Sequence, residues 1–300
     1  MSNRQVIKQG FELVNARYDL NPFEMKLIMN AISEIKVEDK QFYLRKVSVK
    51  ELEKELKVQL KYDRIKELCM ELKKKPIFIE KSAVKGKRKF IVLDWFASLE
   101  YDEETASLEY EISQKLAPYL LELKKRITKA NLEHILPMKS FYSMRLYILL
   151  KEYQKIGSRT FEVAELQELL QVGESMKERY DNFKRKVLNV ALKEINKSDL
   201  YIELSESKKE RKKVIEITFT IKSADKAMTT EILQAFIGRE ISIKGEITKI
   251  IEAYSENGNI YISVMLKGDG TTAKKTVVEM DTKDKFFHAL EMAERQGRLF

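Results

Sequence analysis

Five polar residues near the middle of the chain fall on one side of a predicted helix. Between Tyr180 and Asn196, the polar side carries Asn182, Arg185, Lys186, Asn189 and Lys193, and the apolar side carries Tyr180, Phe183, Val187, Val190, Ala191 and Ile195. A solvated helix face usually mixes acids with bases, because Glu–Lys pairs four residues apart stabilise it. These five polar positions include long cations and amides but no acid. We therefore expect this face to bind something negative that also offers hydrogen-bonding edges.

DNA fits that description. Arginine can bind guanine O6 and N7 together, asparagine does the same for adenine N6 and N7, and lysine serves guanine or phosphate. A basic tract follows the helix, with cations at Lys208, Lys209, Arg211, Lys212 and Lys213. The plainer alternatives are an exposed helix face that happens to lack acids and a solvated charged hairpin. The combination favours base reading by the helix and phosphate contact by the tract.

The elements around this helix occur twice in the chain. The segment VSVKELEKELKV (47–58) aligns with FEVAELQELLQV (161–172), and PIFIE (76–80) aligns with DLYIE (199–203). In both copies a basic tract and then an apolar strand follow. Upstream, residues 21–32 occupy the place that residues 139–150 occupy in the second copy. Two copies at this spacing predict tandem domains, since a solenoid needs at least ~3 shorter repeats.

Each copy is predicted to contain three helices and a basic β-hairpin. The first copy has a helix that starts at Asn21–Pro22, where proline suits the first helical position, and further helices over 49–57 and 62–74. The second copy has helices over 139–150, 163–171 and about 176–196. This order describes a winged helix, in which the third helix of the unit enters the major groove. The predicted fold class is α+β, with winged-helix domains at 1–127 and 128–222.

The two copies differ at their candidate DNA-binding surfaces. Extra residues within 173–184 lengthen the approach to the third helix of the second copy. The third helix of the first copy carries Glu67 and Glu71, so we expect it to read DNA poorly. Its basic tract, 81–89, has no acid and supplies three more candidate phosphate contacts, Lys85, Lys87 and Arg88. Residues 97–112 predict an added β-hairpin, which either pairs with protein or is simply solvated.

The last 78 residues have a different pattern. Residues 223–230 predict a linker, and 239–254, 260–266 and 271–280 predict strands. Residues 281–296 predict a helix capped at Asp281 or Thr282. We expect a small α+β module of unknown role over 223–300, with an oligonucleotide-binding barrel as one alternative.

Composition limits the class of protein. Net charge is +9, with +10 in residues 1–222 and −1 in residues 223–300, which favours a polyanion partner for the first part. No apolar run approaches the ~18 residues of a membrane span, and no signal peptide is visible, so we expect a cytoplasmic protein without membrane contact. The single cysteine, Cys69, predicts a core residue in a reducing compartment.

No arrangement of residues predicts catalysis. The chain lacks a GxxxxGK[ST] phosphate loop, and His134 and His288 are far apart without metal-ligand spacing. Tyr147 and Tyr180 lie on apolar helix faces with no base nearby in sequence. We therefore predict no catalytic residue, no cofactor and no metal.

Several of these segments together resemble a known family. The residues SFYSMRLYILLKEY (140–153), FEVAELQELLQV (161–172), 180–204 and RKKVIEITFTI (211–221), with LVNARYDLNPFEMKLIMNAIS (13–33), resemble iteron-binding plasmid replication initiators of the RepB type. The resemblance covers about residues 5–222 and implies a tandem winged-helix protein. It implies a second domain that reads repeated origin sites, the iterons, and a first domain that contacts the DNA backbone and forms the dimer interface.

The resemblance also implies partners and further contacts. Such initiators bind double-stranded origin DNA, interconvert between monomers and dimers, repress their own gene, help open the duplex, and recruit the host initiator and replicative helicase. Carried over to this chain, the implied phosphate contacts are Lys139, Ser143 and Arg145. Two alternatives stay open: a winged-helix transcriptional repressor without a role in replication, and a rolling-circle nickase, which the two scattered histidines disfavour.

Overall fold

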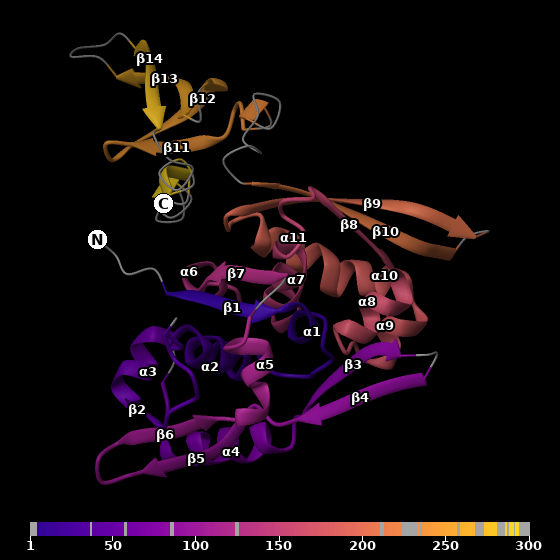
Figure 1. The fold of residues 1–300 in the computed structure, drawn as a ribbon. Coiled ribbons are helices and arrows are strands. Elements are labelled where there is room, and N and C mark those ends of the chain that lie inside the picture. The colour runs from indigo at the N-terminus through magenta and orange to yellow at the C-terminus, as the bar shows by residue number, and fades with distance from the viewer. Residues whose placement is uncertain are drawn as a thin grey trace. The chain divides into compact units, whose positions relative to one another are not determined.

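The chain forms two separate units, residues 1–221 and 222–300, in the computed structural model (Figure 1). The structure describes residues 5–293 except 37, 57–58, 85–86, 124–125, 211–212, 224–232, 235, 257–258, 268–272, 281–285, 287 and 291. The linker expected over 223–230 lies almost wholly outside the described residues, as do the expected helix caps Asp281 and Thr282. Each unit is described by itself below.

The first copy of the repeat has the predicted three helices and wing. Helix α2 (Pro22–Ser33) begins where predicted, because the Asn21 side chain accepts the backbone N–H groups of Phe23 and Glu24, and Glu24 bonds back to the Asn21 N–H. Helices α3 (Val49–Leu56) and α4 (Tyr62–Lys73) follow. Strands β3 (Ile77–Val84) and β4 (Lys87–Leu93) form the wing hairpin.

The second copy repeats this order with one added helix. It contains α7 (Phe141–Lys151), α8 (Val163–Leu169), and a wing of β9 (Leu200–Glu210) and β10 (Lys213–Ser223). The single helix predicted over 176–196 is wrong at its start. Arg179 has extended backbone angles (φ −121°, ψ 104°), so α9 (Glu174–Glu178) ends there and a new helix begins at Tyr180. The residues inserted in the second copy thus form α9 and its turn.

The two copies pair their strands differently. In the second copy β8 (Ser158–Glu162) joins the wing, in the order β8-β10-β9. In the first copy the corresponding strand, β2 (Arg45–Ser48), pairs instead with β6 (Ser107–Ile112), next to β5 (Phe96–Asp102). The added hairpin predicted over 97–112 is therefore present. Because β2 pairs with this added hairpin, the first wing remains a two-stranded hairpin. Backbone hydrogen bonds between Arg17 and Phe78 stabilise it.

A short strand pair joins the copies. Strand β1 (Val6–Gly10) leads into α1 (Phe11–Val14) and pairs antiparallel with β7 (Ile127–Asn131), which leads into α6 (Leu132–Ile135). Buried residues of both copies belong to one hydrophobic core. The predicted boundary between residues 127 and 128 falls at the start of β7, and separating the copies there would break this pairing. The division of the first unit at this point stays a prediction.

Two buried arginines add polar contacts between the copies. Arg145, fully buried in α7, donates to the backbone oxygen of Ala16, and its guanidinium lies 4.3 Å from the ring centre of Tyr18. Arg159 donates to the oxygen of Leu149 (2.8 Å) and to Oδ1 of Asn15 (2.6 Å). The segment that precedes α2 is thereby bound to α7 and β8.

The second unit is an antiparallel sheet with its own core. Its order is β11 (Glu240–Ile243), β12 (Glu246–Glu256), β13 (Asn259–Lys267) and β14 (Ala273–Met280). The single strand predicted over 239–254 is wrong, because Lys244 (φ 50°) and Gly245 (φ 86°) make a tight turn that divides it into β11 and β12. No pairing of β11 with β14 closes a barrel within the described strands. Helical residues over 286–293 agree with the C-terminal helix, where they are described.

Within the described ranges, no helix of either unit combines the length and the apolar character that crossing a bilayer requires.

Because the units have separate cores, we predict that a chain ending at Lys222 keeps the stability of the first unit. Differential scanning calorimetry of the full chain should resolve two transitions, and the shortened chain should retain the one that belongs to residues 1–221, with an unchanged midpoint. A midpoint several degrees lower in the shortened chain would contradict this independence.

Candidate nucleic-acid interface

The candidate reading surface lies on a helix that runs from Tyr180 to Ile195. It consists of α10 (Tyr180–Phe183), one π-helical turn (Lys184–Leu188) and α11 (Asn189–Ile195), and we call the whole the 180–195 helix. Its inner side chains are at most 1% exposed: Phe183, Val187, Leu188, Ala191 and Ile195. Burial of this side places Arg185, Lys186, Asn189 and Lys193 in solvent, as predicted.

The π turn corrects the predicted apolar face. A turn with i→i+5 hydrogen bonds holds more residues than an α turn, so the residues after it are rotated relative to a regular helix. Leu188 is consequently buried, although the period of 3.6 did not assign it to the apolar side. Val190, which the period did assign there, is 39% exposed. The outer face therefore includes one apolar group among its cations and amides.

Three cations on the outer face of this helix have no acid partner among the described residues. Arg185, Lys186 and Lys193 make no ion pair or side-chain hydrogen bond with another described residue, and neither does the amide of Asn189. Asn182 differs from them, because it is half-buried and its amide nitrogen donates to the Ser175 oxygen in α9 (3.3 Å). Four of the five predicted residues therefore present unpaired polar groups to solvent.

The wing of the second copy is less purely cationic than its sequence suggested. The Glu206 carboxylate lies 2.7 Å from the Lys184 Nζ and 2.7 Å from the Lys209 Nζ, and Lys208 lies 4.0 Å from Glu210. Hydrogen bonds from Lys184, the larger influence, and from Lys209 lower the pKa of Glu206 to about 2. The number of cations along residues 205–213 gave no indication that the Glu206 carboxylate lies between the helix and the wing.

The remaining candidates in the wing are only partly described. Lys208, Lys209 and Lys213 are exposed. Arg211 and Lys212 lie outside the described residues.

The contacts implied at the start of α7 need a correction. Lys139 is exposed, but Ser143 and Arg145 are fully buried, because α7 is the central helix of the shared core. A phosphate cannot reach those two side chains in this conformation. The backbone N–H groups of Lys139 and Ser140 are themselves bound to the Glu194 carboxylate of the 180–195 helix (3.2 Å). Only Lys139 therefore remains as a candidate phosphate contact in this segment.

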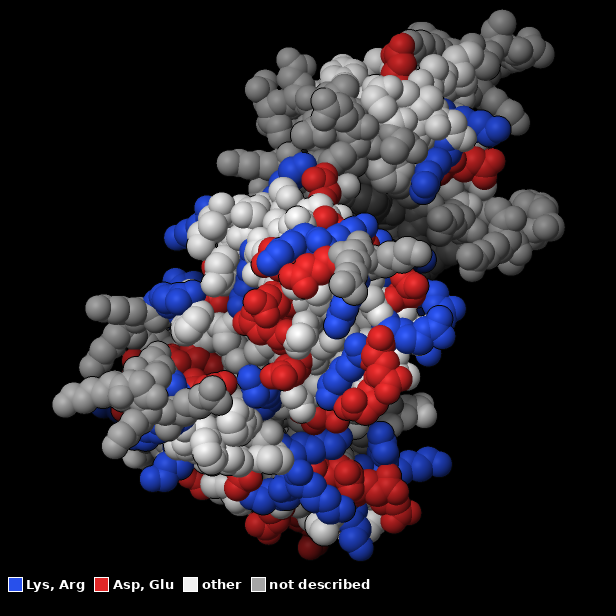
Figure 2. Space-filling view, turned by 90° about the vertical axis from the view of Figure 1, so that its right-hand side faces the viewer, with Lys and Arg blue, Asp and Glu red and all other residues white. Residues whose placement is uncertain are grey.

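The first copy offers a less basic third helix, as predicted. Glu67 and Glu71 are exposed on α4, where they pair with Arg64 (3.1 Å) and Lys74 (2.9 Å). In its wing, Lys85 lies outside the described residues, as do the side chains of Lys87 and Arg88. Both wings extend toward the same side of the first unit (Figure 1). Among the described residues on that side, Lys and Arg are interspersed with Asp and Glu (Figure 2).

A polar network supports the start of the second wing. Asp199, which directly precedes β9, accepts hydrogen bonds from the Tyr147 hydroxyl (2.8 Å) and from Lys151, and the His134 Nε2 lies 3.9 Å away. Burial is the largest single influence on Asp199 and opposes its ionisation, but the hydrogen bond and charge of Lys151, with His134 and Tyr147, together outweigh it, so the pKa of Asp199 is lowered. Burial and the Asp199 charge raise the pKa of Tyr147. Its hydroxyl is therefore a structural donor and a poor nucleophile.

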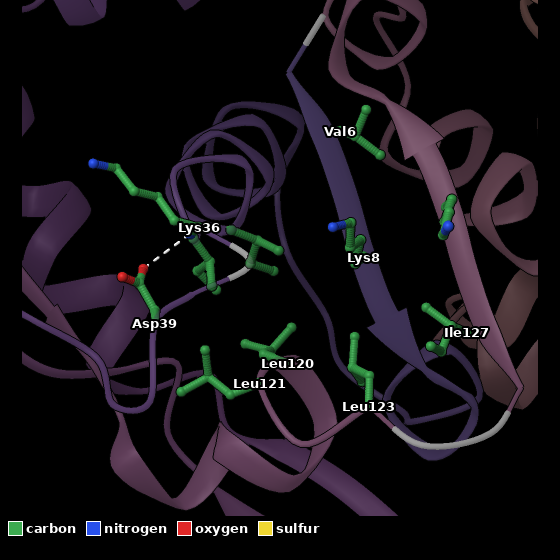
Figure 3. A pocket seen from close by; sticks show the side chains of 11 residues that line it. Val6, Lys8, Lys36, Asp39, Leu120, Leu121, Leu123 and Ile127 are labelled. Carbon is green, nitrogen blue, oxygen red and sulfur yellow. Dashed lines mark hydrogen bonds between the residues drawn. The ribbon is translucent and has the colours of Figure 1, made fainter.

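A hollow of about 320 Å³ lies elsewhere on the first unit (Figure 3). Its apolar wall includes Leu120, Leu121 and Ile127, and the cross-strand partners Lys8 and Lys129 lie at it. No residue that lines it belongs to the 180–195 helix or to either wing, so it is separate from the candidate interface. Within the part of the chain that is described, no group of three or more His, Cys, Asp or Glu side chains could hold a metal ion.

Fold and surface together define a tandem winged-helix protein whose second domain presents Arg185, Lys186, Asn189 and Lys193 to solvent on its third helix. Two family models match the chain: "Initiator Replication protein, WH1" over residues 6–151 and "Initiator Rep protein, WH2" over residues 162–221. The two matches cover more than half of the chain, which belongs to this Rep3 family of replication initiators. Residues after 221 lie outside both models.

Two similar proteins agree with this assignment. A replication initiation protein of Escherichia coli is 32% identical over 154 residues, which are 49% of this chain and 47% of that protein. The chain thus matches about half the length of this relative. The crystal structure of Pi initiator protein in complex with iteron DNA has a TM-score of 0.59 and 20% identity, covering 74% of this chain and 98% of that one. This likeness confirms the predicted pair of winged-helix domains.

The Asp199 network leads to a prediction about stability. Asp199→Ala leaves the buried Tyr147 hydroxyl without its acceptor, and we expect a loss of about 1–3 kcal/mol in the free energy of unfolding at neutral pH. Because the folded pKa of Asp199 is lowered, its contribution is full above the ordinary carboxyl pKa of about 4 and disappears as pH falls through the folded value.

Asp94→Ala is the matched control for this prediction. It removes an exposed aspartate whose ion pair with Lys73 spans 3.8 Å, so its cost should be near zero. Urea unfolding at several pH values measures both variants. Equal losses in the two variants would rule out a structural role for the Asp199 network.

Proposed function

We propose that this protein is a plasmid replication initiator that binds repeated origin sites, the iterons, in double-stranded DNA with sequence specificity. The observation that carries the proposal is the row formed by Arg185, Lys186, Asn189 and Lys193, which are exposed on the third helix of a winged helix and have no side-chain partner among the described residues. Membership of the initiator family supports it. The iteron DNA in the complex of the structural neighbour supports the choice of ligand.

The geometry suggests how the bases are read. The 180–195 helix enters the major groove, as the third helix of a winged helix does. Arg185 and Asn189 lie four residues apart, and both are exposed on the outer side of the helix, so they are placed to contact neighbouring base pairs. Arg185 binds a guanine and Asn189 an adenine through paired hydrogen bonds. Lys186 and Lys193 bind phosphate or guanine, and Lys208 and Lys213 of the wing add phosphate contacts.

The first copy has a different role in this proposal. Its third helix carries paired acids, so it contacts the DNA backbone through its wing and does not read bases. Exposed apolar groups on α4, Tyr62 at 44% and Met70 at 57%, suit it for association with a second copy of the chain. A monomer then binds the origin and a dimer binds an operator, which represses the protein's own gene. The host initiator and the replicative helicase are the further partners.

The proposed activity is binding without catalysis. A transcriptional repressor without a replication role would use the same DNA-binding residues, so only an origin-transformation assay distinguishes it. A rolling-circle nickase would cut supercoiled origin DNA in the presence of Mg²⁺ or Mn²⁺. A nicked product that depends on the protein would refute the non-enzymatic proposal.

The central residue of the reading surface gives the test. Arg185→Ala should weaken binding to the iteron duplex by about 1–3 kcal/mol and relax discrimination at one or two base pairs, because alanine cannot form the paired hydrogen bonds to guanine. Fluorescence anisotropy with the iteron duplex, a scrambled duplex and single-base variants measures this.

A wing variant is the matched control. Lys208→Ala combined with Lys213→Ala should weaken both duplexes alike and reduce the slope of log K against log[salt] by roughly 0.9 for each phosphate that the variant no longer neutralises. If Arg185→Ala behaves in the same way as the wing variant, Arg185 contacts phosphate and does not read a base.

A further inference from the structure

One carboxylate of the second wing binds two of the cations beside the reading surface. Glu206, in β9, places Oε1 2.7 Å from Nζ of Lys184 and Oε2 2.7 Å from Nζ of Lys209. Its side chain is only 20% exposed, whereas the two lysines are 41% and 54% exposed. A single acid therefore neutralises one cation on the helix and one on the wing.

This acid gives the two lysines the kind of anionic partner that a DNA phosphate would give. Short hydrogen bonds from an ammonium to a carboxylate have the geometry and charge of those to a phosphate oxygen. The pKa of Glu206 is lowered to about 2 by Lys184 first and Lys209 second, so the group stays ionised at any physiological pH. Glu206 therefore competes with DNA phosphate for the two lysines.

Glu206 also touches the part of the helix where the reading residues begin. Lys184 is the first residue of the π turn, and Arg185 and Lys186 follow it directly. One turn earlier, Tyr180 is half-buried with its hydroxyl next to Glu206, and burial and the charge of Glu206 raise the pKa of this hydroxyl. The carboxylate thereby ties the start of the reading surface to the wing.

The cations near the proposed interface are thus of two kinds. Arg185, Lys186 and Lys193 have no acid partner among the described residues, whereas Lys184 and Lys209 share one. Affinity for random DNA comes from phosphate contacts that release counterions, while specificity comes from base contacts. A carboxylate that neutralises cations at the junction of helix and wing reduces the affinity for random DNA. It leaves the base-reading groups free.

We propose that Glu206 is a specificity-determining residue, which withholds Lys184 and Lys209 from phosphate and fixes the orientation of the 180–195 helix relative to the wing. The inference rests on the proposed function and deepens it. In this role, a carboxylate in a basic wing lowers the affinity of the protein for DNA that contains no iterons. Glu206 contacts no base itself and acts through the two lysines.

The test is Glu206→Gln in the full chain, because glutamine keeps the shape and removes the charge. Affinity for a scrambled duplex should rise roughly 3- to 30-fold, as the release of two surface cations allows. The slope of log K against log[salt] should steepen by roughly 0.9–1.8. The iteron duplex should gain less, since the helix is no longer held in its fixed orientation, so the ratio of iteron to scrambled affinity should fall.

Glu210→Gln is the matched control. Glu210 lies four residues further along the same strand and so on the same face, is 66% exposed, and comes only within 4.0 Å of Lys208. The variant makes the same change in net charge, and it should leave the ratio of affinities unchanged. A second variant, Lys184→Gln in the Glu206→Gln background, should reverse about half of the added salt slope, because one of the released lysines is then absent.

The outcomes are separable. An unchanged salt slope and an unchanged ratio in Glu206→Gln would overturn the inference, as would an equal effect of Glu210→Gln. If the wild-type protein fails to distinguish iteron from scrambled duplex, the proposed function fails instead. In that case the salt slopes on scrambled DNA still decide whether Glu206 withholds the two lysines.

Discussion

The structure of the candidate interface depends on the burial of one side of the 180–195 helix. Phe183, Val187, Leu188 and Ile195 are buried to 1% exposure or less, and each large apolar side chain contributes about 1.5–3 kcal/mol when it leaves water. Turning this helix over would forfeit most of that energy. Arg185, Lys186, Asn189 and Lys193 consequently have a fixed outward orientation, and the wing and α7 are arranged around it.

The second copy does not hold this helix alone. Its central helix, α7, belongs to a core that both copies share, and the pairing of β1 with β7 joins their first strands. Arg145 and Arg159 bind the segment before α2 through Ala16 and Asn15. A change in the first copy can therefore affect the support of the reading surface, which gives self-association a physical route to DNA binding.

The sequence predicted most of the framework because periodicity and internal repetition report burial and chain order. It could not predict the π turn, since an added residue within one turn exposes Val190 and buries Leu188 against the regular period. The family resemblance implied that Ser143 and Arg145 contact phosphate, but both are buried. Which side of a central helix faces the core depends on the elements that pack around it, and the sequence of the helix alone does not show this. Glu206 was hidden among lysines, because pairing across two elements has no local signature. Whether Asn182 and Lys139 contact DNA stays a prediction.

The central claim is that the protein reads a repeated sequence through the 180–195 helix. Footprinting of the full chain on the DNA that flanks its own gene tests it most directly, with hydroxyl radicals as the probe of the backbone and dimethyl sulfate as the probe of guanine N7. The account predicts a series of protected segments that share one sequence and recur at a regular spacing, with major-groove guanines shielded from methylation in each. Protection without a shared sequence, or uniform weak protection along the whole fragment, would contradict it.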